Sequence, residues 1–141
     1  MPVQHLDRDA GAASGIERVR TGNRFETLAA YSRAARVGDV IAVSGTAALD
    51  ADGKALHPGD AYGQTKVALD LAVEAVERLG ASRERIIRTR LFLAPGADWR
   101  AAIRAHAEVL EGVDPANTTL FVAGFIPEGC LVEVELDAVL G

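Results

Sequence analysis

Three acidic residues near the C-terminal end of the chain, Glu133, Glu135 and Asp137, are candidates for acid–base chemistry. They alternate with apolar residues from Val132 to Ala138, and this alternation is the period of a half-buried strand. The three carboxylates therefore share one strand face. Because like charges on one face repel each other, that face must meet water, cations or a polar site. Partial burial would raise the pKa of a carboxyl group there and suit it to acid–base work.

The other residues that could do chemistry indicate neither a metal centre nor a nucleophile. His106 falls on the apolar stripe of an expected helix and is interpreted as a half-buried histidine with a satisfied side chain. His5 and His57 lie in expected loops, far from a second His or Cys at metal-binding spacing. Cys130 has no nearby histidine in the sequence and is predicted to be inert. Ser44-Gly45 lacks the Gly-x-Ser-x-Gly pattern of a hydrolase, and glycine-rich phosphate loops are missing.

The composition is typical of one cytoplasmic domain. The chain has 141 residues, 49% of them hydrophobic, with one cysteine and a net charge of −5. Its size fits a single domain, which we place at residues 15–141, after a polar, Ala/Gly-rich segment 1–14 that is a candidate for disorder. No apolar run approaches the roughly 18 residues of a membrane span, and no secretion signal opens the chain. The acidic charge argues against nucleic acid as a partner.

Hydrophobic periodicity predicts two helices and a set of strands. The clearest helix runs from Asp60 to Leu79, with Asp60 as its cap and Gly80 as its stop. A second helix is capped by Asp98. Strands are expected at 16–21, 33–36, 40–44, 86–93, 117–124 and 132–138, with Gly45 ending the third strand and residues 23–26 forming a loop.

The helices must cover a sheet, because each carries one apolar stripe. In the second helix this stripe contains Trp99, Ala102, Ile103, His106 and Leu110. Neither helix can bury its stripe alone, so both pack most simply on one face of a mixed sheet, and the expected fold class is α+β. The other, rather apolar sheet face is then bare, which indicates an oligomer.

Several blocks of the sequence, in order along residues 31–141, resemble the Rid family of proteins, also called YjgF. Tyr31–Thr46 is similar to the family's block that ends in Ser-Gly, and Gln64–Leu71 is similar to a segment of its first helix. Val76–Leu93 resembles the family's passage from helix to strand. Ile126–Glu135 resembles the ending with Leu-Pro and Val-Glu-Ile-Glu. No single block is specific, but together they make a strong match.

The resemblance implies a fold, an assembly and an activity. The fold is a chorismate-mutase-like α+β fold, and family members are homotrimers with small-molecule sites in clefts between subunits. The founding members hydrolyse reactive enamines and imines. The chemistry needs no cofactor, because water attacks an electrophilic carbon while an acid manages the protons.

The resemblance also assigns roles to individual residues. Glu133 matches the acid that positions the attacking water, and Tyr31, Ser44 and Gly45 match the frame of the pocket. The arginine that binds the substrate carboxylate is replaced by Thr118, next to Asn117, and the family's pocket cysteine is replaced by Leu120. Neither Thr118 nor Asn117 can supply the positive charge of the arginine. Arg24 and Arg36 are weaker alternatives for supplying it.

Three functions remain open at this point. The first is hydrolysis of an imine, an enamine or a related C–N bond through a water held by Glu133. The second is a non-enzymatic module that binds or senses a metabolite in the same cleft, which the loss of the arginine favours. The third is an endoribonuclease, which the acidic charge of the chain and the lack of a His/Lys catalytic cluster disfavour.

Overall fold

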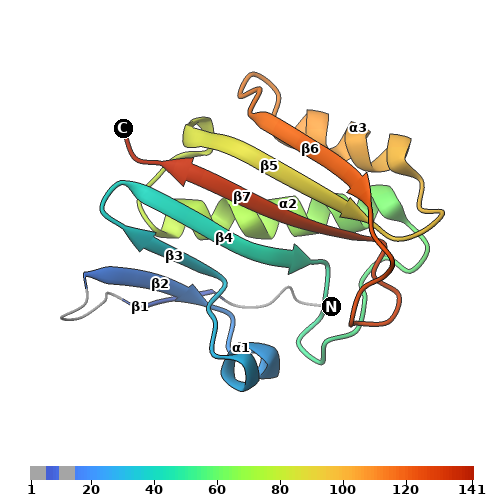
Figure 1. Cartoon of the computed structure of the whole chain (residues 1–141), viewed down its shortest axis with the longest axis horizontal. Coiled ribbons are helices and arrows are strands. Elements are labelled where there is room, and N and C mark those ends of the chain that lie inside the picture. The colour runs from blue at the N-terminus through green and yellow to red at the C-terminus, as the bar shows by residue number, and fades with distance from the viewer. Residues whose placement is uncertain (1–5, 10–14) are drawn as a thin grey trace.

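The computed structural model describes residues 6–9 and 15–141, which form one mixed sheet and the helices that cover it (Figure 1). In the described residues the strand order of the sheet is β1-β2-β3-β4-β7-β5-β6. The strands are β1 (Asp7–Asp9), β2 (Ile16–Arg20), β3 (Ala34–Val37), β4 (Val40–Ala47), β5 (Ile86–Leu93), β6 (Ala116–Phe121) and β7 (Val132–Val139). The helices are α1 (Arg24–Ala29), α2 (Ala61–Arg78) and α3 (Trp99–Val109), with a short 3-10 turn η1 (Arg83–Arg85).

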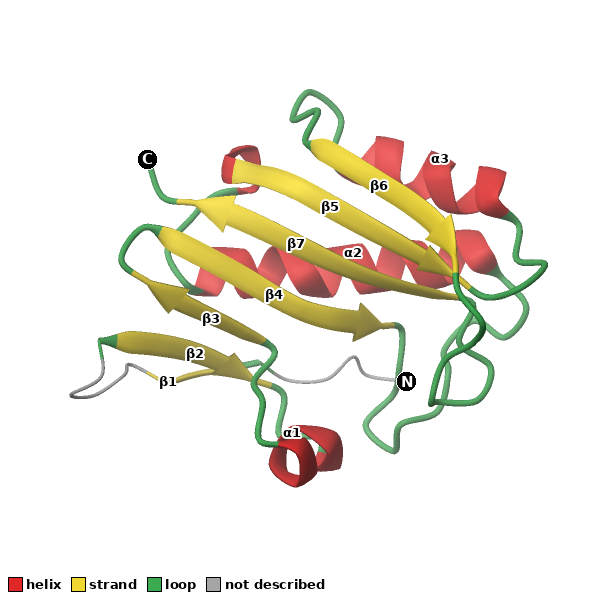
Figure 2. Cartoon of the chain, viewed as in Figure 1, coloured by secondary structure: helices red, strands yellow, loops and turns green. Residues whose placement is uncertain are grey.

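The sheet has one covered and one open face. Helices α2 and α3 lie side by side on the same face, and α1 lies beyond the end of β2, before β3 begins (Figure 2). The predicted α+β class with two helices on one face is therefore confirmed, and α1 is an addition to it. Strand β7 alternates buried and half-buried residues along its whole length, as the sequence predicted. Its buried side faces α2, and its acidic side lies on the open face.

Helix α2 forms where the sequence predicts it. The Asp60 side chain accepts a hydrogen bond from the Gly63 N–H at 2.9 Å, which satisfies one of the free donors of the first turn. Leu69, Ala72 and Val76 are buried against the sheet. Burial of this stripe, rather than intrinsic propensity alone, stabilises the helix.

Helix α3 also forms as predicted, but its buried stripe differs from the expected one. Ala102, Ala105 and Val109 are buried, whereas Trp99 and Ile103 are each 41% exposed. Small residues face α2 and the sheet, so that α3 can approach closely. The two large apolar side chains lie at the margin of the contact, which the spacing alone could not reveal.

Two local predictions around the N-terminal half are wrong. Strand β4 does not end at Gly45 but continues to Ala47, with a shift of its pairing to β7 between Val43 and Thr46. Such a bulge adds a residue to one strand and re-aims its neighbours. The segment expected to be a loop forms helix α1 instead, capped by the Asn23 side chain, which accepts from the Glu26 N–H at 3.0 Å.

The two ends of the described chain join the sheet in different ways. Strand β1, within the N-terminal segment expected to be disordered, pairs antiparallel with β2, and Leu6 beside it is buried. The rest of residues 1–14 lies outside the described residues. At the other end, β6 pairs parallel with β5, while β7 inserts between β4 and β5. No helix in the described ranges is long and apolar enough to cross a bilayer.

Candidate functional site

A cleft of about 410 Å³ opens beside the end of β7 that carries Glu133. Its lining residues come from helix α1 and its flanks, from strand β4, and from the loop that leads into β7. The lining contains both polar and apolar side chains. The polar ones are Asn23, Tyr31, Arg33 and Glu133, and the apolar ones include Phe25, Leu49, Phe125, Ile126 and Pro127.

Glu133 lies at the base of this cleft with its side chain half-buried. Strand pairing places it next to Ala47 of β4 and Phe92 of β5. The carboxylate lies against the backbone of Gly45, where a Cβ atom would overlap Oε1 of Glu133. Burial raises the pKa of Glu133, the positive charge of Arg33 lowers it in part, and Glu135 raises it further. The net result is a raised pKa, which suits a group that exchanges protons.

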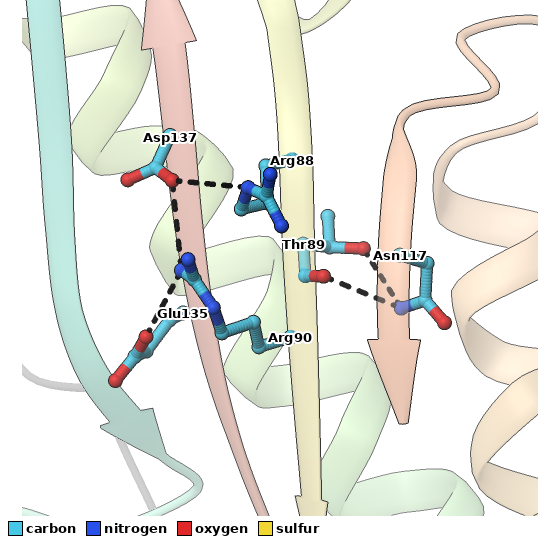
Figure 3. A network of polar contacts seen from close by, with 6 residues as sticks. All are labelled: Arg88, Thr89, Arg90, Asn117, Glu135 and Asp137. Atoms are coloured by element: carbon cyan, nitrogen blue, oxygen red, sulfur yellow. Dashed lines mark hydrogen bonds and ion pairs between the residues drawn. The ribbon is translucent and has the colours of Figure 1, made fainter. Parts of the chain in front are cut away.

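The two other acids of β7 are neutralised by arginines of β5, as Figure 3 shows. Arg90 Nη1 lies 3.2 Å from a carboxylate oxygen of Glu135 and 3.5 Å from one of Asp137. Arg88 Nε lies 3.8 Å from Asp137. Of the three surroundings expected for this acidic face, namely water, cations or a polar site, Glu135 and Asp137 meet cations. Unlike Glu135 and Asp137, Glu133 lines the cleft.

Arg33 is a member of the cleft that the sequence reasoning missed. It is only 5% exposed, and its Nη2 donates a hydrogen bond to the Gly45 carbonyl. Its guanidinium carbon lies 5.7 Å from the centre of the Tyr31 ring, which is a cation–π distance. The available signal was its place in the Tyr31–Thr46 block, directly after Ser32. Arg24 and Arg36, the arginines considered from sequence, do not line this cleft.

Tyr31 and Gly45 line the cleft as the sequence predicts, whereas Ser44 does not. The Ser44 hydroxyl donates to the Ser32 carbonyl at 2.7 Å, so it is committed to holding β4 against the segment before β3. Ser44 lines a neighbouring hollow on the open sheet face, together with Tyr31 and Glu135. Tyr31 thus lies between the two hollows.

The predicted residues on β6 are not brought to this cleft within one chain. Asn117, Thr118 and Leu120 lie on the edge strand, and β5 separates them from β7. The Asn117 amide donates to the Thr89 hydroxyl at 3.0 Å (Figure 3). Thr118 is paired with Arg90 in the strand register, and Leu120 is 41% exposed.

Cys130 requires a correction, because it lines the cleft although the sequence placed it outside the pocket. The loop before β7 folds back and buries the side chain there. Burial, together with the negative charge of Glu133, raises the pKa of the Cys130 thiol to about 11. The predicted inertness agrees with this value, since the thiolate is the reactive form.

His106 fulfils the structural role predicted for it. Its Nε2 lies 2.7 Å from the Thr89 hydroxyl, which joins α3 to β5, and the ring is half-buried. Burial lowers the pKa of His106. In the described part of the chain, no group of three or more His, Cys, Asp or Glu residues could hold a metal ion.

Comparison with known proteins assigns the chain to a family. The family described as "Endoribonuclease L-PSP" matches residues 21–140, a range that contains every element from α1 to β7. The chain belongs to this family, the YjgF or Rid family. A Streptomyces coelicolor protein, "Uncharacterized protein SCO2049", is 41% identical over 129 residues, which are 92% of this chain and 96% of that protein.

Solved structures confirm the YjgF-like fold. The crystal structure of Rv2704 from Mycobacterium tuberculosis, a member of the YjgF/YER057c/UK114 family, superposes with a TM-score of 0.79 at 30% identity, covering 89% of this chain and 99% of that chain. The Rid-family protein YyfA from Yersinia pestis has a TM-score of 0.70 at 25% identity, covering 78% of this chain and 87% of that chain.

Proposed function

We propose that this Rid-family protein binds a small metabolite in the cleft beside Glu133 and hydrolyses an imine, or an enamine through its imine tautomer. One observation carries the proposal: a half-buried carboxyl group with a raised pKa lines a cleft of about 410 Å³. Family membership adds support, since the resemblance implies water activation by the acid at this position. We place this activity in the cytoplasm, with no cofactor.

The reaction follows from ordinary acid–base chemistry. Glu133 as a carboxylate accepts a proton from water while the water oxygen bonds to the imine carbon and the C=N π electrons move to nitrogen. The resulting carbinolamine nitrogen takes up the proton from Glu133. The Glu133 carboxylate then takes the hydroxyl proton and passes it to the amine nitrogen, the carbonyl forms, and the C–N bond breaks with its electron pair on nitrogen, which leaves as ammonia. The sum is one imine and one water giving one carbonyl compound and one ammonia, and a pKa nearer to neutrality helps both transfers.

We further propose that the protein is a homotrimer whose clefts are completed by neighbouring subunits. Support comes from the edge strand β6, which exposes Leu120 (41%) and Phe121 (51%), and from the open face of the sheet. An exposed edge strand and apolar side chains are surfaces that a monomer normally protects. In this assembly Thr118 and Leu120 of one subunit would reach the cleft of the next.

Ammonia release tests the activity. Imines are generated freshly from several amino acids, and ammonia is measured with and without the purified wild-type protein, whose mass in solution is determined by light scattering. Faster ammonia release by a trimer supports the proposal. Binding of metabolites without faster release would instead favour the non-enzymatic module, which the replacement of the family arginine by Thr118 supports.

The endoribonuclease activity in the family's name is tested by the same preparation. The cleft lining contains one arginine but no histidine or lysine in the described residues. Together with the net charge of −5, this composition disfavours an RNA backbone as ligand. We expect no salt-sensitive RNA binding and no cleavage.

A further inference from the structure

Arg33 is buried in a way that leaves part of its hydrogen-bonding capacity unused. The side chain is 5% exposed and lines the cleft. Its Nη2 donates to the Gly45 carbonyl, but its Nε is buried and has no hydrogen-bond partner. Buried polar groups are hydrogen-bonded in nearly all native structures, and an exception needs an explanation.

The positive charge of Arg33 also lacks a matched anion. Among the side chains that the structure describes, no ion pair within 4.0 Å involves Arg33, although Glu133 is close enough for Arg33 to lower its pKa. A buried charge is costly unless it is paired and hydrogen-bonded. The Gly45 carbonyl and the Tyr31 ring offset only part of this cost.

An anion that enters the cleft would supply the missing partner for the charge of this guanidinium, although not for its enclosed Nε. A guanidinium presents a planar fork of N–H donors that matches the two oxygens of a carboxylate. The hydrogen bond to Gly45 fixes the position of this fork beside Glu133. Arg33 therefore has the properties of a receptor whose position is set before the ligand binds.

The apolar residues of the lining limit what the rest of the ligand can be. Phe25, Leu49, Phe125 and Ile126 line the same cleft as Arg33 and offer an apolar surface. A ligand that contacts both has a negative group and an apolar substituent.

We propose that Arg33 binds the carboxylate of a small, apolar-substituted monocarboxylate, and so replaces the guanidinium missing at position 118. This inference rests on the proposed site but not on its catalytic activity. The residue comes from the same chain as Glu133, from the segment before β3. A bound carboxylate would also compensate the charge of Arg33, which now favours the ionised form of Glu133.

The test compares two probes that differ only in charge at one end. Phenylacetate and phenylacetamide are titrated into the wild-type protein by calorimetry. We expect the carboxylate to bind at least about tenfold more tightly, because hydrogen bonds to charged groups are the strong ones. Equal affinity for both probes, or binding of neither, overturns the inference.

Variants assign the preference to Arg33. In Arg33→Gln the ratio of affinities should fall to about one, and in Arg33→Lys, which keeps the charge but loses the planar fork, it should be reduced. Arg78→Gln is the matched control, because it removes the same charge from an exposed arginine of α2 that pairs with Glu74. If Arg33→Gln does not fold, Arg33→Lys decides, and an unchanged ratio in that variant overturns the inference.

The outcome is separable from that of the proposed function. Ammonia release without any preference for phenylacetate would leave the hydrolase standing and reject the role of Arg33. An Arg33-dependent preference for phenylacetate without ammonia release would support the role of Arg33 and reject the hydrolase.

Discussion

Gly45 of β4 lies directly against the carboxyl group of Glu133 on the adjacent strand β7. A Cβ atom at position 45 would overlap Oε1 of Glu133, and the glycine has no left-handed conformation that would favour it for another reason. The bulge in β4 brings these two residues together. The absence of a side chain at position 45 thus makes room for the acid.

The first prediction concerns this contact. Gly45→Ala should destabilise the protein by about 1–3 kcal/mol, as overpacking does, and should reduce ammonia release by displacing the carboxylate. In a Glu133→Ala background the same change should cost almost nothing, because the overlapping atoms are gone. Urea unfolding of the four proteins measures this coupling. An equal cost in both backgrounds would show that the two side chains do not compete for the space.

The second prediction concerns the effect of Glu133 on stability. Its pKa in the folded protein is raised above the ordinary value of 4.5, so the folded state holds this proton more tightly than the unfolded chain does. The stability that Glu133 contributes is fully present below pH 4.5 and is lost as the pH rises through the raised pKa. Glu133→Gln should therefore be more stable than wild type at neutral pH.

This difference should shrink as the pH falls below 4.5, and thermal unfolding at a series of pH values measures it. Glu135→Gln is the control, since Arg90 pairs with that carboxylate at 3.2 Å and its loss should not stabilise the protein. A Glu133→Gln variant that is less stable than wild type at neutral pH would contradict the raised pKa.

The third prediction concerns the thiol of Cys130. With a pKa of about 11, roughly one thiol in a thousand is ionised at about pH 8. The folded protein should react slowly with Ellman's reagent, and phenylacetate should slow the reaction further, because Cys130 lines the same cleft. The unfolded protein in guanidinium is the control and should react at once. A fast reaction of the folded protein at this pH would argue against the buried placement.

The fourth prediction concerns His106. Burial lowers its pKa below the ordinary 6.5, so the unfolded chain binds this proton more readily than the folded protein does. The stability it contributes is present above pH 6.5 and is lost as the pH falls through 6.5 toward the folded-state pKa. Wild type should lose more stability than His106→Gln on acidification. Equal losses of stability for the two proteins would contradict the lowered pKa of His106.

The parts of the fold with regular periodicity could be predicted from the sequence. Helix α2 and strand β7 bury one face each, and burial imposes a repeat that single residues reveal. Helix α1 could not be found this way, because its six residues are too few to show a repeat and depend on the cap by Asn23. The end of β4 was predicted wrongly because Gly45 lies in a bulge rather than in a turn, so the strand continues past it.

The candidate site could be predicted only in part, and for a related reason. Glu133, Tyr31 and Gly45, which the resemblance to the Rid family assigns to the pocket, line the cleft. Arg33 and Cys130 were missed because a sequence gives the charge of a side chain but not its burial. Asn117, Thr118 and Leu120 lie on another edge of the same chain, and only an assembly of subunits could bring them to the cleft.

The most direct measurement is ammonia release from a freshly generated imine by wild type and by Glu133→Gln, compared at equal protein concentration. Loss of a positioned acid–base group costs about 100-fold or more in rate. Wild type should release ammonia faster than buffer alone, and the rate with Glu133→Gln should be lower than that of wild type by about 100-fold or more. Equal rates for the two folded proteins would contradict it, because water would then be activated without the carboxyl group of the cleft.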